Sequence, residues 1–179
     1  MKKIVLTFGL ISGGILSLML LATLPFHESI DLDTGAVIGY TTMVASFMLI
    51  FVGVKSYRDT VGGGRLSFGR GLAVGVLIAV VSSACYVVTW EVIYFGYKGD
   101  FMQKYRDHTL EKARAAGDSP EVVARKAAEF DRFAELYQNP AFNAAITFIE
   151  PMPVGLVVAL VSAGVLRRNS RGWAAGARS

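Results

Sequence analysis

The chain has 179 residues, of which 53% are hydrophobic and 18% are charged, and its mean hydropathy is +0.47. This composition excludes an ordinary soluble domain and predicts a polytopic membrane protein. The formal net charge is +4, but the basic residues flank the apolar runs instead of forming one stripe, so no nucleic-acid partner is expected. The single cysteine, Cys85, lies inside an apolar run, so no disulfide framework, metal site or other cofactor is expected.

The first predicted span covers residues 4–24. Two lysines precede it, as in a secretory signal, but its apolar run of 21 residues is longer than the core of a signal peptide. We therefore expect an uncleaved membrane span. Gly9, Gly13 and Ser17 recur every four residues, and this spacing predicts the close approach of a neighbouring helix.

The loop after the first span begins at Pro25 and contains acidic residues and a histidine, but no Lys or Arg. Loops without basic residues are readily translocated across the membrane. The cluster His27, Glu28, Asp31 and Asp33 is predicted to be a solvated loop, with a metal or proton site as the alternative.

The second span is predicted at residues 35–54 and the third at residues 71–95. A basic loop joins them, and its three consecutive glycines at positions 62–64 predict a flexible turn. Trp90 and Tyr94 near the end of the third span are typical of an aromatic belt at the outer interface. This span carries a second ridge of small residues, which are Gly71, Gly75, Ala79 and Ser83.

The segment after the third span differs in character, because it holds eight basic and eight acidic side chains. We predict that residues 98–140 form an extracytoplasmic insert of two amphipathic helices. Gly117 is expected to end the first helix, and Ser119 and Pro120 to begin the second. The two helices are expected to pair as a hairpin or to lie on the membrane surface, with protein binding through residues 100–137 as a further alternative.

The fourth span is predicted at about residues 144–166, and a basic tail follows it. Ten basic residues fall at the two termini and in the loop between the second and third spans, whereas the loop after the first span has none. The positive-inside rule therefore predicts an inner-membrane protein with both termini in the cytoplasm. The chain divides into three spans at 1–97, the insert at 98–140, and the fourth span with its cytoplasmic tail at 141–179.

Two carboxylates, Glu91 and Glu150, lie at membrane depth, where ionisable residues are costly and commonly functional. At 1.5 Å per residue, Glu91 lies roughly 31 Å from Arg70, and Glu150 lies roughly 25 Å from Arg167. Glu91 is therefore expected at the outer interface, with Glu150 a few Å inside it.

Glu150 is the stronger candidate because the sequence Pro-Met-Pro follows it and deprives two carbonyls of their helical donors. A kinked helix is expected there, and together with Asn143 and Thr147 it offers a site for a cation, a proton or a polar headgroup. In the alternative, Glu150 only caps a helix contact and Glu91 is an ordinary interfacial residue.

The sequence lacks the motifs of serine hydrolases, metalloproteases and dithiol enzymes, and its two histidines lie in different predicted outer segments. No enzyme activity is therefore expected. Arg58 and Asp59, in the loop after the second span, are a candidate ion pair at the inner face. The alternative is an ordinary basic loop that only sets the topology.

Three stretches carry a resemblance to a known family. They are KSYRD at residues 55–59, SFGRG at residues 67–71 and the proline-containing start of the fourth span. With the charged insert, they make residues 2–168 similar to the domain-of-unknown-function family 4199, which are bacterial four-span membrane proteins. The resemblance implies a fold and a membrane location, but it implies no activity and no site residues.

We therefore expect an all-α protein with four spans whose outer hairpin serves an interaction or accessory role in the cell envelope. The alternative is a small transporter, or a lipid- or cation-binding protein, that uses Glu150. The candidate partners are membrane lipid, a protein bound through residues 100–137 and a second copy of the chain. A cavity that reaches Glu150 would favour the alternative.

Overall fold

The computed structural model describes residues 1–26, 31–96 and 101–167. Within these ranges the chain is helical and forms no β-strand, which confirms the predicted all-α fold class. The elements in chain order are α1 (Lys2–Thr23), the short 3-10 helix η1 (Leu24–Phe26), α2 (Leu32–Thr60), α3 (Phe68–Gly96), α4 (Phe101–Ala115), α5 (Pro120–Tyr137), α6 (Pro140–Ile149) and α7 (Met152–Leu166).

Four segments of the described chain are long and apolar enough to cross a membrane, namely α1 with η1, α2, α3, and α6 with α7. The helices α2 and α3 each have 29 residues, so each is about 43 Å long and exceeds the ~30 Å hydrocarbon core. Many apolar side chains of the four segments face outward; Leu18 of α1 and Val165 of α7, for example, are each 67% exposed. Such a surface suits lipid, and the chain is a multi-pass membrane protein.

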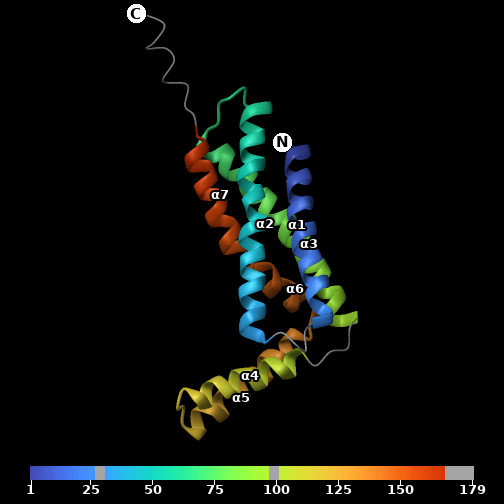
Figure 1. Cartoon of the computed structure of the whole chain (residues 1–179), viewed down its shortest axis with the longest axis vertical. Coiled ribbons are helices and arrows are strands. Elements are labelled where there is room, and N and C mark those ends of the chain that lie inside the picture. Colours follow the sequence, from blue (N-terminus) through green and yellow to red (C-terminus); the bar gives the residue numbers. More distant parts are fainter. Residues whose placement is uncertain (27–30, 97–100, 168–179) are drawn as a thin grey trace, which may run out of the picture.

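The spans form a bundle in which α1 and α7 each pack against both α2 and α3 (Figure 1). The ridges of small residues allow this close packing. A Cβ built on Gly13 of α1 would lie 2.6 Å from the Cβ of Cys85 on α3. On the other side of α3, a Cβ on Gly75 would lie 2.8 Å from that of Ala159, and one on Gly155 would lie 2.8 Å from that of Ala79. The predicted close approaches are confirmed, because only glycine leaves room for these backbones.

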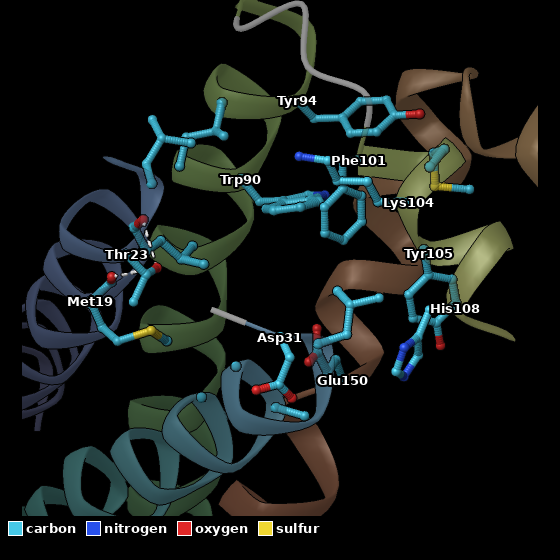
Figure 2. A pocket seen from close by; sticks show the side chains of 18 of the residues that line it. Met19, Thr23, Asp31, Trp90, Tyr94, Phe101, Lys104, Tyr105, His108 and Glu150 are labelled. Atoms are coloured by element: carbon cyan, nitrogen blue, oxygen red, sulfur yellow. Dashed lines mark hydrogen bonds between the residues drawn. The ribbon is translucent and has the colours of Figure 1, made fainter. Parts of the chain in front are cut away.

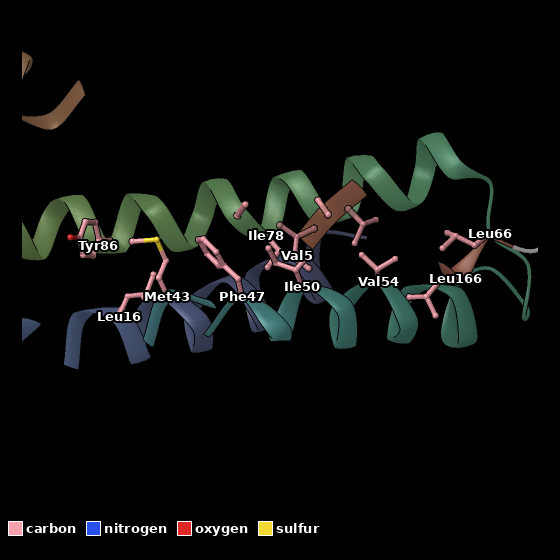
Figure 3. Close-up of a cluster of buried hydrophobic side chains, with 13 residues drawn as sticks. Val5, Leu16, Met43, Phe47, Ile50, Val54, Leu66, Ile78, Tyr86 and Leu166 are labelled. Atoms are coloured by element: carbon pink, nitrogen blue, oxygen red, sulfur yellow. The ribbon is translucent and has the colours of Figure 1, made fainter. Parts of the chain in front are cut away.

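The core of the bundle consists of apolar side chains with a few fully paired hydroxyls. Phe47, Ile50 and Ile78 are completely buried between α2 and α3 (Figure 3). Ser12 and Ser46 join α1 to α2, because each hydroxyl donates to the other residue's carbonyl, at 3.2 and 2.8 Å. Buried polar groups in a membrane protein need such partners, so these serines stabilise the contact without leaving an unpaired group.

The helices α4 and α5 pack as a hairpin across the end of the bundle opposite the N-terminus (Figure 1). Gly117 has a φ of +82° after the end of α4, and the Ser119 hydroxyl accepts from the Val122 N–H at 3.4 Å to cap α5. Arg106 joins the two helices by donating to Asp131, with 2.8 Å between Nε and Oδ1. The predicted end of one helix and start of the next are confirmed, and the pair adopts the hairpin arrangement.

The fourth span is broken between α6 and α7. The break falls at Glu150 and Pro151, where the sequence predicts a kink. The proline has no N–H, so the helix loses a hydrogen bond to the preceding turn and changes direction. The break leaves the Glu150 side chain facing α3, where it receives a hydrogen bond from Tyr86.

Candidate functional site

The Glu150 carboxylate lies at the junction of α6, α7 and α3. Tyr86 donates its hydroxyl to Oε2 of Glu150 at 3.2 Å. Tyr86 is buried, whereas Glu150 is exposed because it borders a cavity. The carboxylate is therefore held in place by the protein while remaining accessible to a ligand.

A closed chain of hydrogen bonds lies beside Glu150. The indole Nε1 of Trp90 donates to the Tyr137 hydroxyl at 3.0 Å, and Thr147 Oγ1 donates to Asn143 Oδ1 at 3.2 Å. Because the Thr147 proton is used in this way, the 3.2 Å contact between Tyr137 and Thr147 must have Tyr137 as its donor. Asn143 Nδ2 then donates to the Tyr137 carbonyl at 3.2 Å. The chain joins the hairpin to α3 and α6.

The Tyr137 hydroxyl, at the end of α5, has a raised pKa. Burial is the largest cause of the rise. The hydrogen bond that the hydroxyl accepts from the Trp90 indole lowers this pKa, whereas the charges of Glu150 and Glu91 raise it, and the net result lies above the ordinary value of 10.0. Tyr137 therefore stays protonated, and able to donate to Thr147, throughout the neutral range.

We expect the contact between Trp90 and Tyr137 to persist up to about pH 10 and to weaken above it. A docked Tyr137 keeps its proton, whereas an undocked one loses it near pH 10, so docking is fully stable below that pH and is lost as the pH rises through the raised pKa. Near-ultraviolet circular dichroism between about pH 8 and 12 measures this transition. The Tyr137→Phe variant cannot ionise, so an identical alkaline transition in that variant would contradict the assignment.

A cavity of about 1160 Å³ lies between the hairpin helix α4 and the ends of α1, α2 and α3 (Figure 2). Its wall on the bundle side is mainly apolar and includes Met19 and Leu20 of α1. Along α2 the lining runs from Leu32 to Met43, a distance of about 16 Å at 1.5 Å per residue. Glu150 also lines the cavity, which is thus deep, apolar on the bundle side and equipped with one carboxylate from the fourth span.

Charged groups gather on the hairpin side of the cavity. Asp107, His108 and Glu111 of α4 line it. The hairpin is tied to α2 by an ion pair between Lys112 and Asp33, and His108 Nε2 lies 3.6 Å from Asp33 Oδ1. The Trp90 indole of α3 also donates to Tyr137 of the hairpin. The hairpin is therefore anchored on two different spans, α2 and α3, beside the cavity.

Three of the predicted site residues come together in the structure. Asn143 and Thr147 belong to the hydrogen-bonded chain, and Glu150 follows on the same segment. Glu91 does not line the cavity, and its Oε1 is buried without a hydrogen-bond partner among the described residues. The two acidic candidates therefore differ in their surroundings, because only Glu150 is accessible from the cavity.

The remaining predicted residues lie elsewhere. Arg58 and Asp59 form an ion pair at the opposite end of the bundle, with 2.7 Å between Nε and Oδ1, and they do not contribute to the cavity. His27 and Glu28 lie outside the described residues. Within the described ranges, no group of three or more His, Cys, Asp or Glu side chains is placed to hold a metal ion.

The comparison with known families agrees with the architecture. The family described as "protein of unknown function (DUF4199)" matches residues 7–168. The chain belongs to the DUF4199 family. No curated protein and no solved structure matches it. The function of this DUF4199 protein therefore has to be argued from its own site.

Two residues of the site are not identified by the sequence. Tyr86 lies within an apolar run, and Tyr137 within the apolar stripe of an amphipathic helix. The available signal for Tyr86 is its spacing, since it lies in a span four residues before Trp90 and on the same helical face, and its hydroxyl needs a partner in lipid. Tyr137 has no comparable signal, because its partners come from other helices.

Proposed function

We propose that this DUF4199 protein binds an amphiphilic small molecule in the cavity between its spans and its hairpin. The observation that carries the proposal is the cavity of about 1160 Å³ with Glu150 in its lining. Ligand sites commonly combine an apolar wall with a few placed polar groups, and this volume lies just above their usual range of about 300–1,000 Å³. The apolar wall suits a hydrocarbon chain, and the carboxylate suits a polar head.

The same geometry argues for binding rather than for a pore. Beyond Met43 the centre of the bundle is filled by Ile50, Val54, Val74 and Ile78, which are all completely buried. The cavity is thus closed toward the end that carries the N-terminus. We propose that the ligand enters and leaves on the hairpin side, without a chemical step that would make the protein an enzyme.

The proposal includes an orientation. The ends of the spans opposite the hairpin carry the basic residues of the N-terminus and of the loop between α2 and α3. By the positive-inside rule, both termini would lie in the cytoplasm of a bacterial cell and the hairpin on the outer side of its inner membrane. The ligand would then come from the outer leaflet or from the space beyond it.

An accessory role in the envelope is the second candidate. It is favoured by the hairpin, which projects past the bundle (Figure 1) and carries an exposed Leu136. A protein partner would bind through residues 100–137, and a second copy of the chain could take the same place, whereas no nucleic acid is expected. Deleting the hairpin would abolish such a role, whereas a change confined to the cavity would leave it intact.

The test uses quenching of Trp90 fluorescence in lipid nanodiscs, with Trp173 replaced by Phe so that only one tryptophan remains. An amphiphile with a brominated decyl chain should quench Trp90 in a saturable manner. Gly39→Phe should weaken this quenching by about tenfold, because Gly39 lines the cavity and a Cβ there meets no atom within 4 Å, so the added ring can occupy the space of the ligand.

The matched control is Gly14→Phe, at a position where a Cβ also meets no atom within 4 Å but which lies away from the cavity. This variant should be quenched like the parent protein. Quenching that never saturates, or that is equal in the Gly39 and Gly14 variants, would show that the amphiphile only dissolves in the bilayer, and the proposal would be wrong.

A further inference from the structure

A smaller chamber of about 190 Å³ adjoins the large cavity, and it has an unusual lining. We call it the aromatic chamber. Four of its six lining residues are aromatic, one is a threonine and one is a carboxylate: Tyr86, Trp90, Phe101, Tyr137, Thr147 and Glu150. Four of these six residues also line the large cavity, so a ligand in the cavity can extend one end into the chamber.

Every side-chain donor in the aromatic chamber is already engaged by the protein. The Tyr86 hydroxyl donates to Glu150, and the Trp90 indole donates to Tyr137. Tyr137 donates to Thr147, which in turn donates to Asn143 outside the chamber. The side chains are thus left with acceptors only, which are the carboxylate oxygens, the hydroxyl lone pairs and the faces of the rings.

The charges around the chamber favour a ligand with a positively charged head. The lining of the adjoining cavity holds four carboxylates, those of Asp31, Asp107, Glu111 and Glu150, against one lysine, Lys104. In the aromatic chamber, an anionic or purely accepting head would meet the Glu150 carboxylate and no available side-chain donor, so it would lose hydrogen bonds to water without replacing them. A cation gains from the carboxylate and from the faces of aromatic rings, which attract ammonium groups.

A metal ion fits the aromatic chamber less well than an organic cation. The chamber supplies one carboxylate, whereas Ca²⁺ takes about six to eight oxygen ligands and Mg²⁺ keeps a near-octahedral set. Trp90 and Phe101 are packed edge to face with 5.1 Å between their ring centroids, so much of the wall is hydrocarbon. An ammonium group that carries alkyl substituents matches both the apolar rings and the charge.

We propose that the aromatic chamber binds the organic cation of the ligand, a protonated amine or a quaternary ammonium, with Glu150 as its counter-ion. This inference rests on the proposed function, which places the hydrocarbon chain of an amphiphile in the large cavity. It adds the chemical class of the polar head of that amphiphile. The cation can belong to an amphiphile or to a small free amine, since both offer the same group to the chamber.

The experiment measures competition with the brominated probe in nanodiscs by decyltrimethylammonium, decyl glucoside and decanesulfonate, which share one chain and differ in head charge. The trimethylammonium compound should bind about tenfold or more tightly than the glucoside, and the sulfonate should bind most weakly. Tetramethylammonium distinguishes an amphiphile from a small free amine as the ligand. It should compete at a concentration similar to that of decyltrimethylammonium only if the ligand is a small free cation.

The decisive variant is Glu150→Gln, which keeps an acceptor for Tyr86 but removes the charge. It should abolish the preference for the trimethylammonium head over the glucoside head. Glu91→Gln is the matched control, since Glu91 lines neither the cavity nor the chamber, and it should keep the preference. Equal binding of the three heads to the parent protein would overturn the cation assignment, as would equal losses of the preference in the Glu150 and Glu91 variants. Either result would leave the proposed amphiphile binding in place. If no compound binds in a saturable manner, both the cation assignment and the proposed function are wrong.

Discussion

Replacing Gly13 with leucine should destabilise the protein by about 3 kcal/mol or more, at or beyond the upper end of the usual cost of overpacking. A Cβ at this position would lie 2.6 Å from the Cβ of Cys85 and 3.2 Å from the Cα of Ser82. The second contact is with backbone, so it cannot be relieved by a change of rotamer, and α1 must move away from α3. Heating in detergent followed by size-exclusion chromatography measures the loss as a lowered midpoint.

The neighbouring Gly14 supplies the control for this prediction. A Cβ on Gly14 meets no atom within 4 Å, and the residue is exposed on the lipid-facing side of α1. Gly14→Leu should therefore leave stability unchanged or raise it by up to about 1 kcal/mol, because leucine favours a helix more than glycine does. Equal midpoints for the two variants would mean that α1 and α3 are not packed as closely as described.

The bundle is largely predictable from the sequence because its determinants are local. Apolar runs of sufficient length define the spans, and the spacing of Gly13 and Gly75 identifies the faces that pack closely. Pro151 likewise marks the break in the fourth span, since the missing N–H acts within its own helix. The hairpin boundaries at Gly117 and Ser119 follow from the same kind of local chemistry.

The site is predictable only in part, for a physical reason. Asn143, Thr147 and Glu150 lie on one helical segment, so their proximity follows from helical spacing alone. Their partners, Tyr86 and Tyr137, come from α3 and α5, and a sequence does not specify the register of one helix against another. The cavity likewise depends on how helices are placed relative to one another, because residues at the ends of α1, α2 and α3 line it together with residues of the hairpin helix α4.

Replacing Tyr137 with phenylalanine should weaken the docking of the hairpin on the bundle. The change removes the acceptor of the Trp90 indole and the donor to Thr147 while the ring remains in place. A half-buried donor left without a partner costs about 1 kcal/mol, the low end of the range for buried groups, so opening of the hairpin should become about fivefold more frequent. Hydrogen–deuterium exchange of the amides in residues 120–137 measures this as a loss of protection.

Tyr105→Phe is the matched control on the same hairpin. Tyr105 is 45% exposed, and the hydrogen bond that it accepts from Thr109 is at its backbone carbonyl, which the substitution does not change. Its ring contacts with Phe101 and Phe130 survive the substitution, so exchange should remain at the parent level. If the two variants exchange alike, the Lys112–Asp33 ion pair must be the stronger anchor, and the hydrogen-bonded chain around Tyr137 would serve only to position Thr147 and Asn143. If only Tyr137→Phe opens the hairpin, the same hydroxyl that closes the wall of the aromatic chamber also controls access to it.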